Sequence, residues 1–383
     1  MLRGIVSDFK AAGHTVTTTL DSRIAALKPP LLADLLHSVS PGDSLKSVIR
    51  NAADSADAAL VIAPESNGTL QSIVEIIKET STVSLNSSPA TIQDATDKTA
   101  LSRRVKALGL AAPKTVLLDA PDGVDAAKMS IRDELELPVV IKPANGVSCD
   151  GLSVVNNWSD VKFAVKKASF ESSDGHFLAQ EFIHGINASV SLIANKEKAL
   201  PISLNKQNIS LGTRSSDSRY EGGFVPFDSS LKAKAFDAAE KTVTSFKGIA
   251  GHVGVDIVLA EEQQFVIEIN PRFTTSVVGL RKVAGFNLAE AILEAFMNHE
   301  LPTDVQTSGY ACFSKVAVPN PTAQAFRRVC QMDTVASPPF PVAGNGTSFA
   351  LVQSYGGSLD EATSRLRDVE KRVRQVCGGG QIN

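Results

Sequence analysis

The sequence is poor in cysteine and has no excess of either charge, and each of these shortages excludes a class of protein. The four cysteines stand far apart without any CxxC pair, at positions 149, 312, 330 and 377, so we predict neither structural disulfides nor a cysteine zinc site. Lysine and arginine total 38 against 41 aspartates and glutamates, a formal charge of −3. This balance argues against a nucleic-acid partner.

Long apolar runs and the common catalytic motifs are missing as well. Because no run of about 18 apolar residues and no charged-then-apolar leader occurs, we expect a cytoplasmic protein without a membrane partner. The sequence contains no GxxxxGK[ST] phosphate loop, no HExxH zinc helix and no GxSxG nucleophile turn. At 383 residues, with 43% apolar and 21% charged residues, the composition predicts a globular protein with two or three packed layers or domains.

In the first ninety residues short strands alternate with helices, which is the pattern of a parallel α/β sheet. A continuously apolar strand is predicted over 59–64, a helix over 70–78 and another strand over 83–85. The sequence opens on a helix over 1–12, whereas such domains usually begin on a central strand. We therefore expect that a first strand is missing through truncation or a late start codon; the alternative is a domain built without it.

A polar stretch over 86–97 separates this unit from the rest of the chain. A helix begins there at Lys98 and ends at Gly109. Further strands are predicted over 115–118, 138–142, 178–182, 189–194, 252–259, 265–269 and 348–354, and further helices over 231–246, 288–298 and 359–376. We predict an α/β (α+β) protein with three parts, at 1–93, 94–180 and 181–383.

An acidic and amide cluster is the main candidate site. GVDIVL places Asp256 on one strand, and FVIEINPR places Glu268 and Asn270 on the next. Residues i and i+2 of a strand share a face, and a hairpin brings Asp256 alongside them. Two carboxylates and an amide oxygen suit Mg²⁺ that carries nucleotide phosphates, and Arg272 could bind phosphate oxygens with two hydrogen bonds. The alternative is a charged hairpin edge that ends in an Asn-Pro turn.

Two further segments carry candidate nucleotide-binding residues. Lys142 ends a strand and precedes a loop of small residues with Gly146 and Gly151, a way to hold phosphates without a helix N-terminus. Lys98 is a second candidate cation, although taken by itself it is better interpreted as an ordinary lysine at a helix start. In LAQEFIHG, Glu181 could accept ribose hydroxyls, and the main chain of the two residues after it, Phe182 and Ile183, could bind the adenine edge.

In this order and spacing, these segments resemble the ATP-grasp superfamily over roughly residues 94–300, with a small Rossmann-like α/β domain before it. The resemblance implies that ATP phosphorylates a carboxylate and that an amine attacks the acyl phosphate, giving an amide, ADP and phosphate. It implies Mg²⁺ or Mn²⁺ on Asp256, Glu268 and Asn270, and catalytic roles for Arg272 and Lys142. The nucleotide would be bound by Lys98, Lys142, Gly146, Ser148, Gly151, Gln180, Glu181, Phe182 and Ile183.

The polar stretch over 204–228 is the candidate substrate segment. It resembles the ATP-grasp ligases of methanofuran biosynthesis that join the γ-carboxylate of glutamate to the amine of tyramine. On this resemblance Arg214 would pair with the glutamate α-carboxylate, and the other substrate candidates are Tyr220, Gly222 and Gly223. The alternatives are another amino-acid or dipeptide ligase, a purine-pathway ATP-grasp enzyme, or a nucleotide-binding module without catalysis.

Three features are interpreted as structural. Cys149 is expected to be a small filler in the phosphate loop, and His252 a core residue or a neighbour of the ligands. The charged tail helix over 359–376 is expected to be a solvated face or the interface of a homodimer, since dimers are common in the superfamily.

Overall fold

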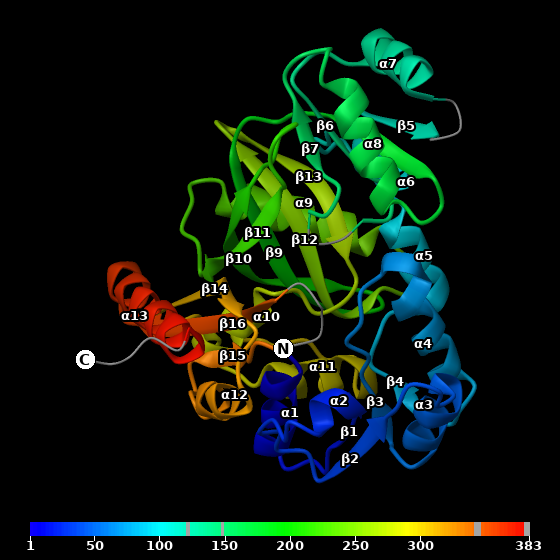
Figure 1. Ribbon diagram of the computed structural model, residues 1–383. Coiled ribbons are helices and arrows are strands. Elements are labelled where there is room, and N and C mark those ends of the chain that lie inside the picture. Colours follow the sequence, from blue (N-terminus) through cyan, green and yellow to red (C-terminus); the bar gives the residue numbers. More distant parts are fainter. Residues whose placement is uncertain (120–122, 147–148, 341–345, 379–383) are drawn as a thin grey trace.

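The computed structural model describes residues 1–119, 123–146, 149–340 and 346–378. Its N-terminal part holds two separate pairs of parallel strands, surrounded by short helices (Figure 1). The strands are β1 (Thr17–Asp21) with β2 (Leu35–Val39), and β3 (Ala58–Ala59) with β4 (Val83–Ser84). The helices are α1 (Leu2–Ala11), α2 (Ser22–Ala25), α3 (Leu45–Asp54), the 3₁₀ turn η1 (Ser66–Gly68) and α4 (Thr69–Lys78).

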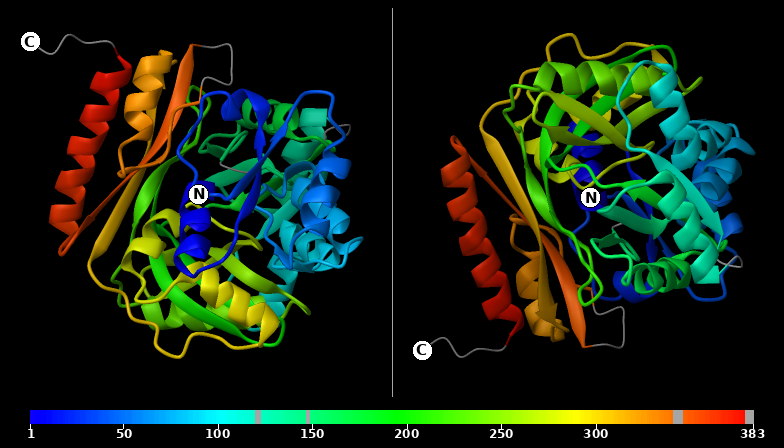
Figure 2. Two further views of the ribbon diagram at one scale, coloured as in Figure 1. Left: turned by 90° about the horizontal axis from the view of Figure 1, so that it is seen from below. Right: turned by 90° about the horizontal axis from the view of Figure 1, so that it is seen from above.

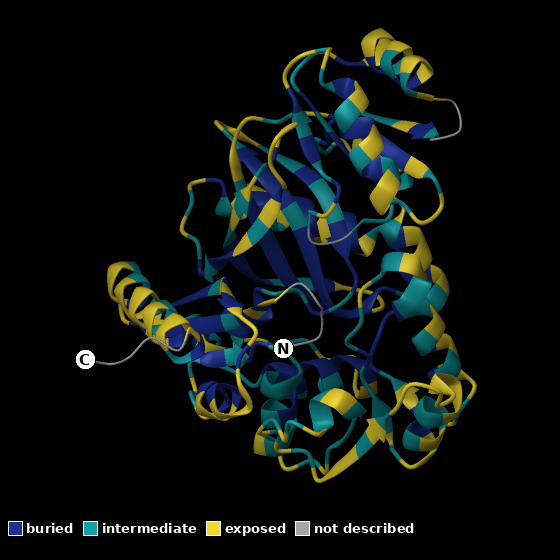
Figure 3. Cartoon of the chain, in the orientation of Figure 1, coloured by how far each residue is buried: buried dark blue, intermediate teal, exposed yellow. Residues whose placement is uncertain are grey.

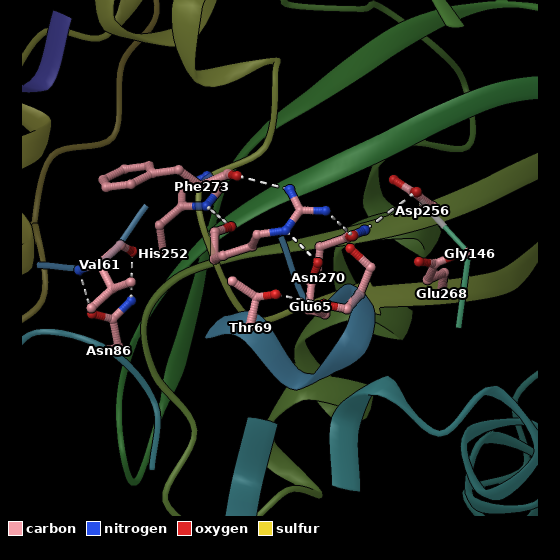
Figure 4. A network of polar contacts seen from close by, with 12 residues as sticks. Val61, Glu65, Thr69, Asn86, Gly146, His252, Asp256, Glu268, Asn270 and Phe273 are labelled. Atoms are coloured by element: carbon pink, nitrogen blue, oxygen red, sulfur yellow. Dashed lines mark hydrogen bonds and ion pairs between the residues drawn. The ribbon is translucent and has the colours of Figure 1, made fainter. Parts of the chain in front are cut away.

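The strand predicted over 59–64 is much shorter in the structure, where regular pairing stops at Ala59. A side chain takes the place of the neighbouring strand. Asn86 Oδ1 accepts from the Val61 N–H at 2.7 Å, and Asn86 Nδ2 donates to the Val61 carbonyl at 3.0 Å (Figure 4). The buried backbone groups of Val61 are therefore satisfied without a ladder, which periodicity alone could not predict.

The middle of the chain forms a four-stranded antiparallel sheet in the order β5-β8-β6-β7. Two helices, α5 (Pro89–Thr96) and α6 (Lys98–Ala107), lead into it, and α7 (Gly123–Glu134) and α8 (Val161–Glu171) cover one face. The strands are β5 (Thr115–Asp119), β6 (Val139–Pro143), β7 (Ser153–Val155) and β8 (His176–Glu181). Because Val139 and Ile141 alternate with Lys142 along β6, the opposite face presents Lys142.

An eight-stranded antiparallel sheet follows, in the order β13-β12-β9-β10-β11-β14-β16-β15 (Figures 1 and 2). Its strands are β9 (Ile186–Asn195), β10 (Ala199–Ser210), β11 (Arg219–Val225), β12 (Ala250–Ala260), β13 (Gln263–Asn270), β14 (Tyr310–Pro319), β15 (Val335–Ser337) and β16 (Thr347–Gly356). Leu192 and Ile193 pack into different cores, because the sheet is covered on both faces. Figure 3 shows its central strands as the most buried part of the chain.

Helix α9 (Lys232–Thr244) covers one face of this sheet, and α10 (Val277–Val283) and α11 (Leu288–Met297) cover the other. Helices α12 (Ala323–Cys330) and α13 (Leu359–Cys377) lie at the end formed by β14–β16.

Among the described residues, no helix combines the length and the apolar character needed to cross a membrane. The α/β fold class predicted from the sequence is confirmed, and the helices over 231–246, 288–298 and 359–376 lie within two residues of their predicted ends.

Candidate active site

The two carboxylates of the predicted cluster face each other across a hairpin. Strands β12 and β13 pair antiparallel with Asp256 directly opposite Glu268 and Gly254 opposite Asn270. Asp256 is half-buried. Its Oδ1 accepts from Gln207 Nε2 at 2.9 Å, and its Oδ2 accepts from Asn270 Nδ2 at 3.4 Å, a contact drawn in Figure 4. Burial, together with the neighbouring Glu268 carboxylate, raises the pKa of Asp256 to about 7.

This donor set fits a divalent cation that prefers oxygen ligands. The hydrogen-bond partners of Asp256 are neutral amides, so its own charge has no direct ion-pair partner among the described residues, although that of the adjacent Glu268 lies near Lys98. In the part of the chain that the structure describes, no three His, Cys, Asp or Glu side chains gather at one point. A metal would therefore use two carboxylates and the Asn270 oxygen, and would keep oxygen ligands from water or phosphate, as Mg²⁺ commonly does.

A cavity of about 300 Å³ opens beside this hairpin and is lined by residues of both sheets. Lys98 Nζ donates to the carbonyls of Ala144 and Gly146, each at 3.2 Å, and lies 3.5 Å from Glu268 Oε1. Lys142 Nζ donates to Gln180 Oε1 at 3.0 Å, and burial lowers the pKa of this ammonium to about 8. Two lysines from different elements thus bracket the cavity next to the carboxylates, where phosphate charge would be compensated.

The predicted adenine-binding segment lies at the edge of the same cavity, which Glu181, Phe182 and Ile183 line. Glu181 is exposed, and its Oε2 accepts from the Lys114 N–H at 3.1 Å. The Phe182 N–H is already bonded to the Pro138 carbonyl at 3.3 Å. The groups of this segment left for an adenine edge are therefore the Phe182 carbonyl and the main chain of Ile183.

The Arg272 guanidinium lines the cavity beyond Asn270 and has three partners. Its Nη2 donates to Asn270 Oδ1 at 3.2 Å, its Nη1 to the Phe273 carbonyl at 3.0 Å, and its Nε to Glu65 Oε2. Sequence reasoning missed Glu65, which belongs to the N-terminal part of the chain. The only local signal was an acidic residue directly after the apolar stretch that ends at Pro64.

Sequence reasoning also missed a chain of hydroxyl and amide groups beside Arg272. Asn205 Nδ2 donates to Ser191 Oγ at 3.0 Å, Ser191 Oγ lies 3.3 Å from Ser276 Oγ, and Ser276 Oγ lies 2.8 Å from Thr274 Oγ1. Thr274 and Ser276 line the cavity together with Gln207. Small hydroxyls give no periodic signal, so only the folded strands show that they converge.

Several predicted site residues lie elsewhere. Arg214 is not among the residues that line the cavity: its guanidinium stacks 3.8 Å from the centre of the Phe163 ring and lies 3.7 Å from Asp160 Oδ1, on α8 and the residue before it. The sequence of a polar loop does not indicate where a charged side chain points. In the structure the Arg214 guanidinium packs on the face of the Phe163 ring. Tyr220 does line the cavity, whereas Ser148 lies outside the described residues.

Of the four glycines predicted to belong to the site, one lines the cavity and three do not. Gly146 lines the cavity, but Gly151 does not; at φ +72° it lies against Pro143 and Glu171. Gly222 and Gly223 lie between neighbouring strands, where a Cβ would come within 2.1 Å of the Phe313 carbonyl oxygen and 2.0 Å of the Lys206 carbonyl oxygen, respectively. Close strand packing explains these two glycines without a substrate.

Replacing Gly223 with alanine should lower the free energy of unfolding by about 2 kcal/mol, because β10 must move away to admit the methyl group. Chemical denaturation of the variant measures this loss. Gly357→Ala is the control, since its Cβ would meet nothing closer than 3.6 Å. Equal stability of the two variants would contradict the packing role.

His252 has the core position predicted for it, and Cys149 lies on the cavity wall. His252 is buried, stacks on Phe273 with ring centres 5.2 Å apart, and its Nδ1 lies 2.9 Å from the Arg272 carbonyl oxygen. Burial lowers its pKa to about 4, so the ring is neutral and Nδ1–H donates. Cys149 lines the cavity, and burial raises the pKa of its thiol to about 11, which keeps it protonated and unreactive.

The buried His252 should make the protein sensitive to acid. The unfolded chain protonates this ring near pH 6.5, but the folded chain does so only near pH 4, so stability falls as the pH drops between these values. We expect a contribution of roughly 1 kcal/mol per pH unit between about pH 6 and 5. Denaturation of His252→Phe over this range should show a flatter slope than the native chain. Parallel slopes for His252→Phe and the native chain would contradict the assignment.

Comparison with known proteins agrees with this geometry. An ATP-grasp domain model matches residues 95–276, and a pre-ATP-grasp domain model matches residues 14–92. Tyramine–L-glutamate ligase of Methanocaldococcus jannaschii is 31% identical over 270 residues, which cover 69% of this chain and 70% of that protein.

Solved structures show the same fold. Biotin carboxylase from Campylobacter jejuni superposes with a TM-score of 0.74 at 16% identity, covering 95% of this chain and 87% of that one. An L-amino acid ligase from Bacillus licheniformis gives a TM-score of 0.69 at 16% identity, covering 97% and 94%. The chain belongs to the ATP-grasp family and is an ATP-dependent carboxylate–amine ligase.

Proposed function

We propose that this ligase joins the γ-carboxylate of L-glutamate to the amine of tyramine, in the biosynthesis of a methanofuran-type cofactor. The observation that carries the proposal is the 31% identity with tyramine–L-glutamate ligase over 70% of that protein. The cavity supports it, because polar Gln207 and Thr274 and apolar Ile209 and Leu211 line it together. An acidic amino acid and an aromatic amine need both kinds of surface.

The nucleotide is proposed to lie between the two sheets. The Phe182 carbonyl and the main chain of Ile183 would bind the adenine edge, and Glu181 the ribose. Lys98 and Lys142 would bind the phosphates: both lysines are buried, and their ammonium groups already lie on oxygen acceptors next to the carboxylates. Little side-chain entropy is then lost on binding, which favours tight and well-oriented phosphates.

Asp256, Glu268 and Asn270 are the proposed ligands of one or two Mg²⁺ or Mn²⁺ ions. When bound, such an ion supplies positive charge to the phosphate oxygens as the γ-phosphoryl group moves to the substrate carboxylate. Arg272 would donate to the oxygens of the transferred group from a direction fixed by its partners. The protein residues themselves form no covalent bond to the substrate in this scheme.

With Arg214 held on Phe163, the α-carboxylate of glutamate needs another partner. The hydroxyls of Thr274 and Ser276 lie on the cavity wall two and four residues after Arg272 and are the proposed donors. They would orient glutamate so that its side-chain carboxylate, and not the α-carboxylate, points toward Arg272.

ADP release should test the proposal, with Mg²⁺-ATP, L-glutamate and tyramine present and each component left out in turn. Turnover that needs both substrates, with γ-glutamyltyramide as product by mass spectrometry, would support it. ATP binding without turnover on this pair, but turnover with an amino acid as the amine, would replace the assignment by a dipeptide ligase. ATP binding with no turnover on any pair would leave the substrate proposal without support.

A further inference from the structure

A contact between parts of the chain that are 207 residues apart fixes the direction of Arg272. The guanidinium has five N–H donors. One on Nε goes to Glu65 Oε2, one on Nη1 to the Phe273 carbonyl and one on Nη2 to Asn270 Oδ1. With three directions occupied, the plane of the guanidinium is set, and two of its N–H groups have no partner among the described residues and could donate to an anion in the cavity.

Glu65 is held rigidly at the place where this contact is made. It precedes a tight turn in which Asn67 and Gly68 take left-handed conformations, at φ +56° and +65°, and the Gly68 N–H donates to the Glu65 carbonyl at 3.1 Å. The Thr69 hydroxyl donates to the Ser66 carbonyl at 2.9 Å and closes the turn onto the start of α4 (Figure 4). The turn thus directs the Glu65 side chain toward Arg272, which follows the end of strand β13.

The burial of the Glu65 carboxylate is not explained by a gain in the stability of the fold. Its side chain is only 9% exposed, and its Oε1 is buried without a hydrogen-bond partner among the described residues. Burial raises the pKa of this carboxyl against the opposing effect of Arg272, a sign that its charge is poorly solvated. A buried carboxylate with an unsatisfied oxygen costs free energy.

The ion pair between Asp8 and Arg281 serves as a comparison, because it is an example of a contact with a structural role. Asp8 of α1 and Arg281 of α10 are each 15% exposed, and both carboxylate oxygens are used: Arg281 Nε donates to Oδ2 at 2.8 Å, and Nη2 donates to Oδ1. That pair is bidentate and lies away from the cavity residues. Glu65, by contrast, contacts its arginine through one oxygen only, and that arginine is one of the residues that line the cavity.

We propose that Glu65 is a positioning residue through which the N-terminal part of the chain orients Arg272 for phosphoryl transfer. The inference rests on the proposed role of Arg272. The N-terminal part then contributes to the chemical step and not only to the fold. Loss of the Glu65 charge weakens one of the three contacts that orient the Arg272 guanidinium, so the turnover number falls while nucleotide affinity, which depends on Lys98 and Lys142, is retained.

The test compares Glu65→Gln with Asp8→Asn, which removes the charge of the structural pair. Glu65→Gln should lower kcat roughly 10-fold with the KM for ATP changed less than about 2-fold. Asp8→Asn should leave kcat within about 2-fold while lowering the unfolding midpoint. A kcat of Glu65→Gln within 2-fold of the native value, or an equal loss in both variants, would overturn the proposal.

A second readout needs no substrate and therefore separates this proposal from the glutamate–tyramine assignment. In protein labelled with ¹⁵N-arginine, the Nε–H signals of Arg272 and Arg281 should be shifted and slow to exchange, and Arg272→Lys and Arg281→Lys assign them. Glu65→Gln should remove the protection of Arg272 alone, and Asp8→Asn that of Arg281 alone. An unchanged Arg272 signal in Glu65→Gln would overturn the proposal. If Glu65→Gln does not fold, Glu65→Asp, which keeps the charge but shortens the reach, decides by the same loss of the Arg272 signal.

Discussion

Replacing Glu268 with glutamine should lower ligase turnover by roughly 10³-fold, the largest effect expected of any single substitution. Glu268 lies opposite Asp256 on the hairpin and 3.5 Å from Lys98. Glutamine keeps the shape of the side chain but removes its charge, so the site loses a proposed metal ligand and the partner of a buried lysine together. ADP release with Mg²⁺-ATP and both substrates measures the loss.

In the absence of metal the stability of the same variant should change little, because it loses the repulsion between Glu268 and Asp256 together with the ion pair between Glu268 and Lys98. A matched control is Glu262→Gln, an exposed residue in the turn between the same two strands. It should retain full turnover. Near-native turnover of Glu268→Gln would show that this carboxylate is not a ligand and would move the metal site elsewhere.

Arg272→Lys should lower kcat by roughly 10²-fold even though the positive charge is retained. Lysine has no planar fork, so it cannot keep the contacts to Glu65, Asn270 and the Phe273 carbonyl at once. The charge would then lie in a different place from the oxygens that it must stabilise. Single-turnover measurements separate this chemical effect from nucleotide binding, which we expect to change less than about 3-fold.

The control for this substitution is Arg281→Lys, which affects the pair with Asp8. It should reduce stability and leave kcat nearly unchanged, since that pair lies away from the cavity residues. If Arg272→Lys lost nucleotide affinity and kept kcat, the guanidinium would serve binding alone. The orientation of Arg272 by Glu65 would then have no effect on the chemical step.

The sequence alone was sufficient to predict that Asp256, Glu268 and Asn270 lie together on one hairpin. Asp256 and Glu268 are twelve residues apart in the chain, on strands with clear apolar patterns. The alternation of a strand and the pairing of a hairpin are local properties, and together they place the two carboxylates and Asn270 on one face. The α/β fold class was predicted from the alternation of short strands and helices, and the ATP-grasp family from the resemblance of the motifs in their order and spacing.

Other features required the tertiary structure because they depend on residues far apart in the chain. Nothing near Glu65 in the sequence indicates that it meets Arg272, 207 residues later. Nothing near Arg214 indicates that Phe163 holds it away from the cavity. Gly223 was predicted to be a substrate residue, although the neighbouring strand explains it. Local periodicity determines which face of a strand a side chain occupies, whereas the packing of distant elements decides what that side chain meets.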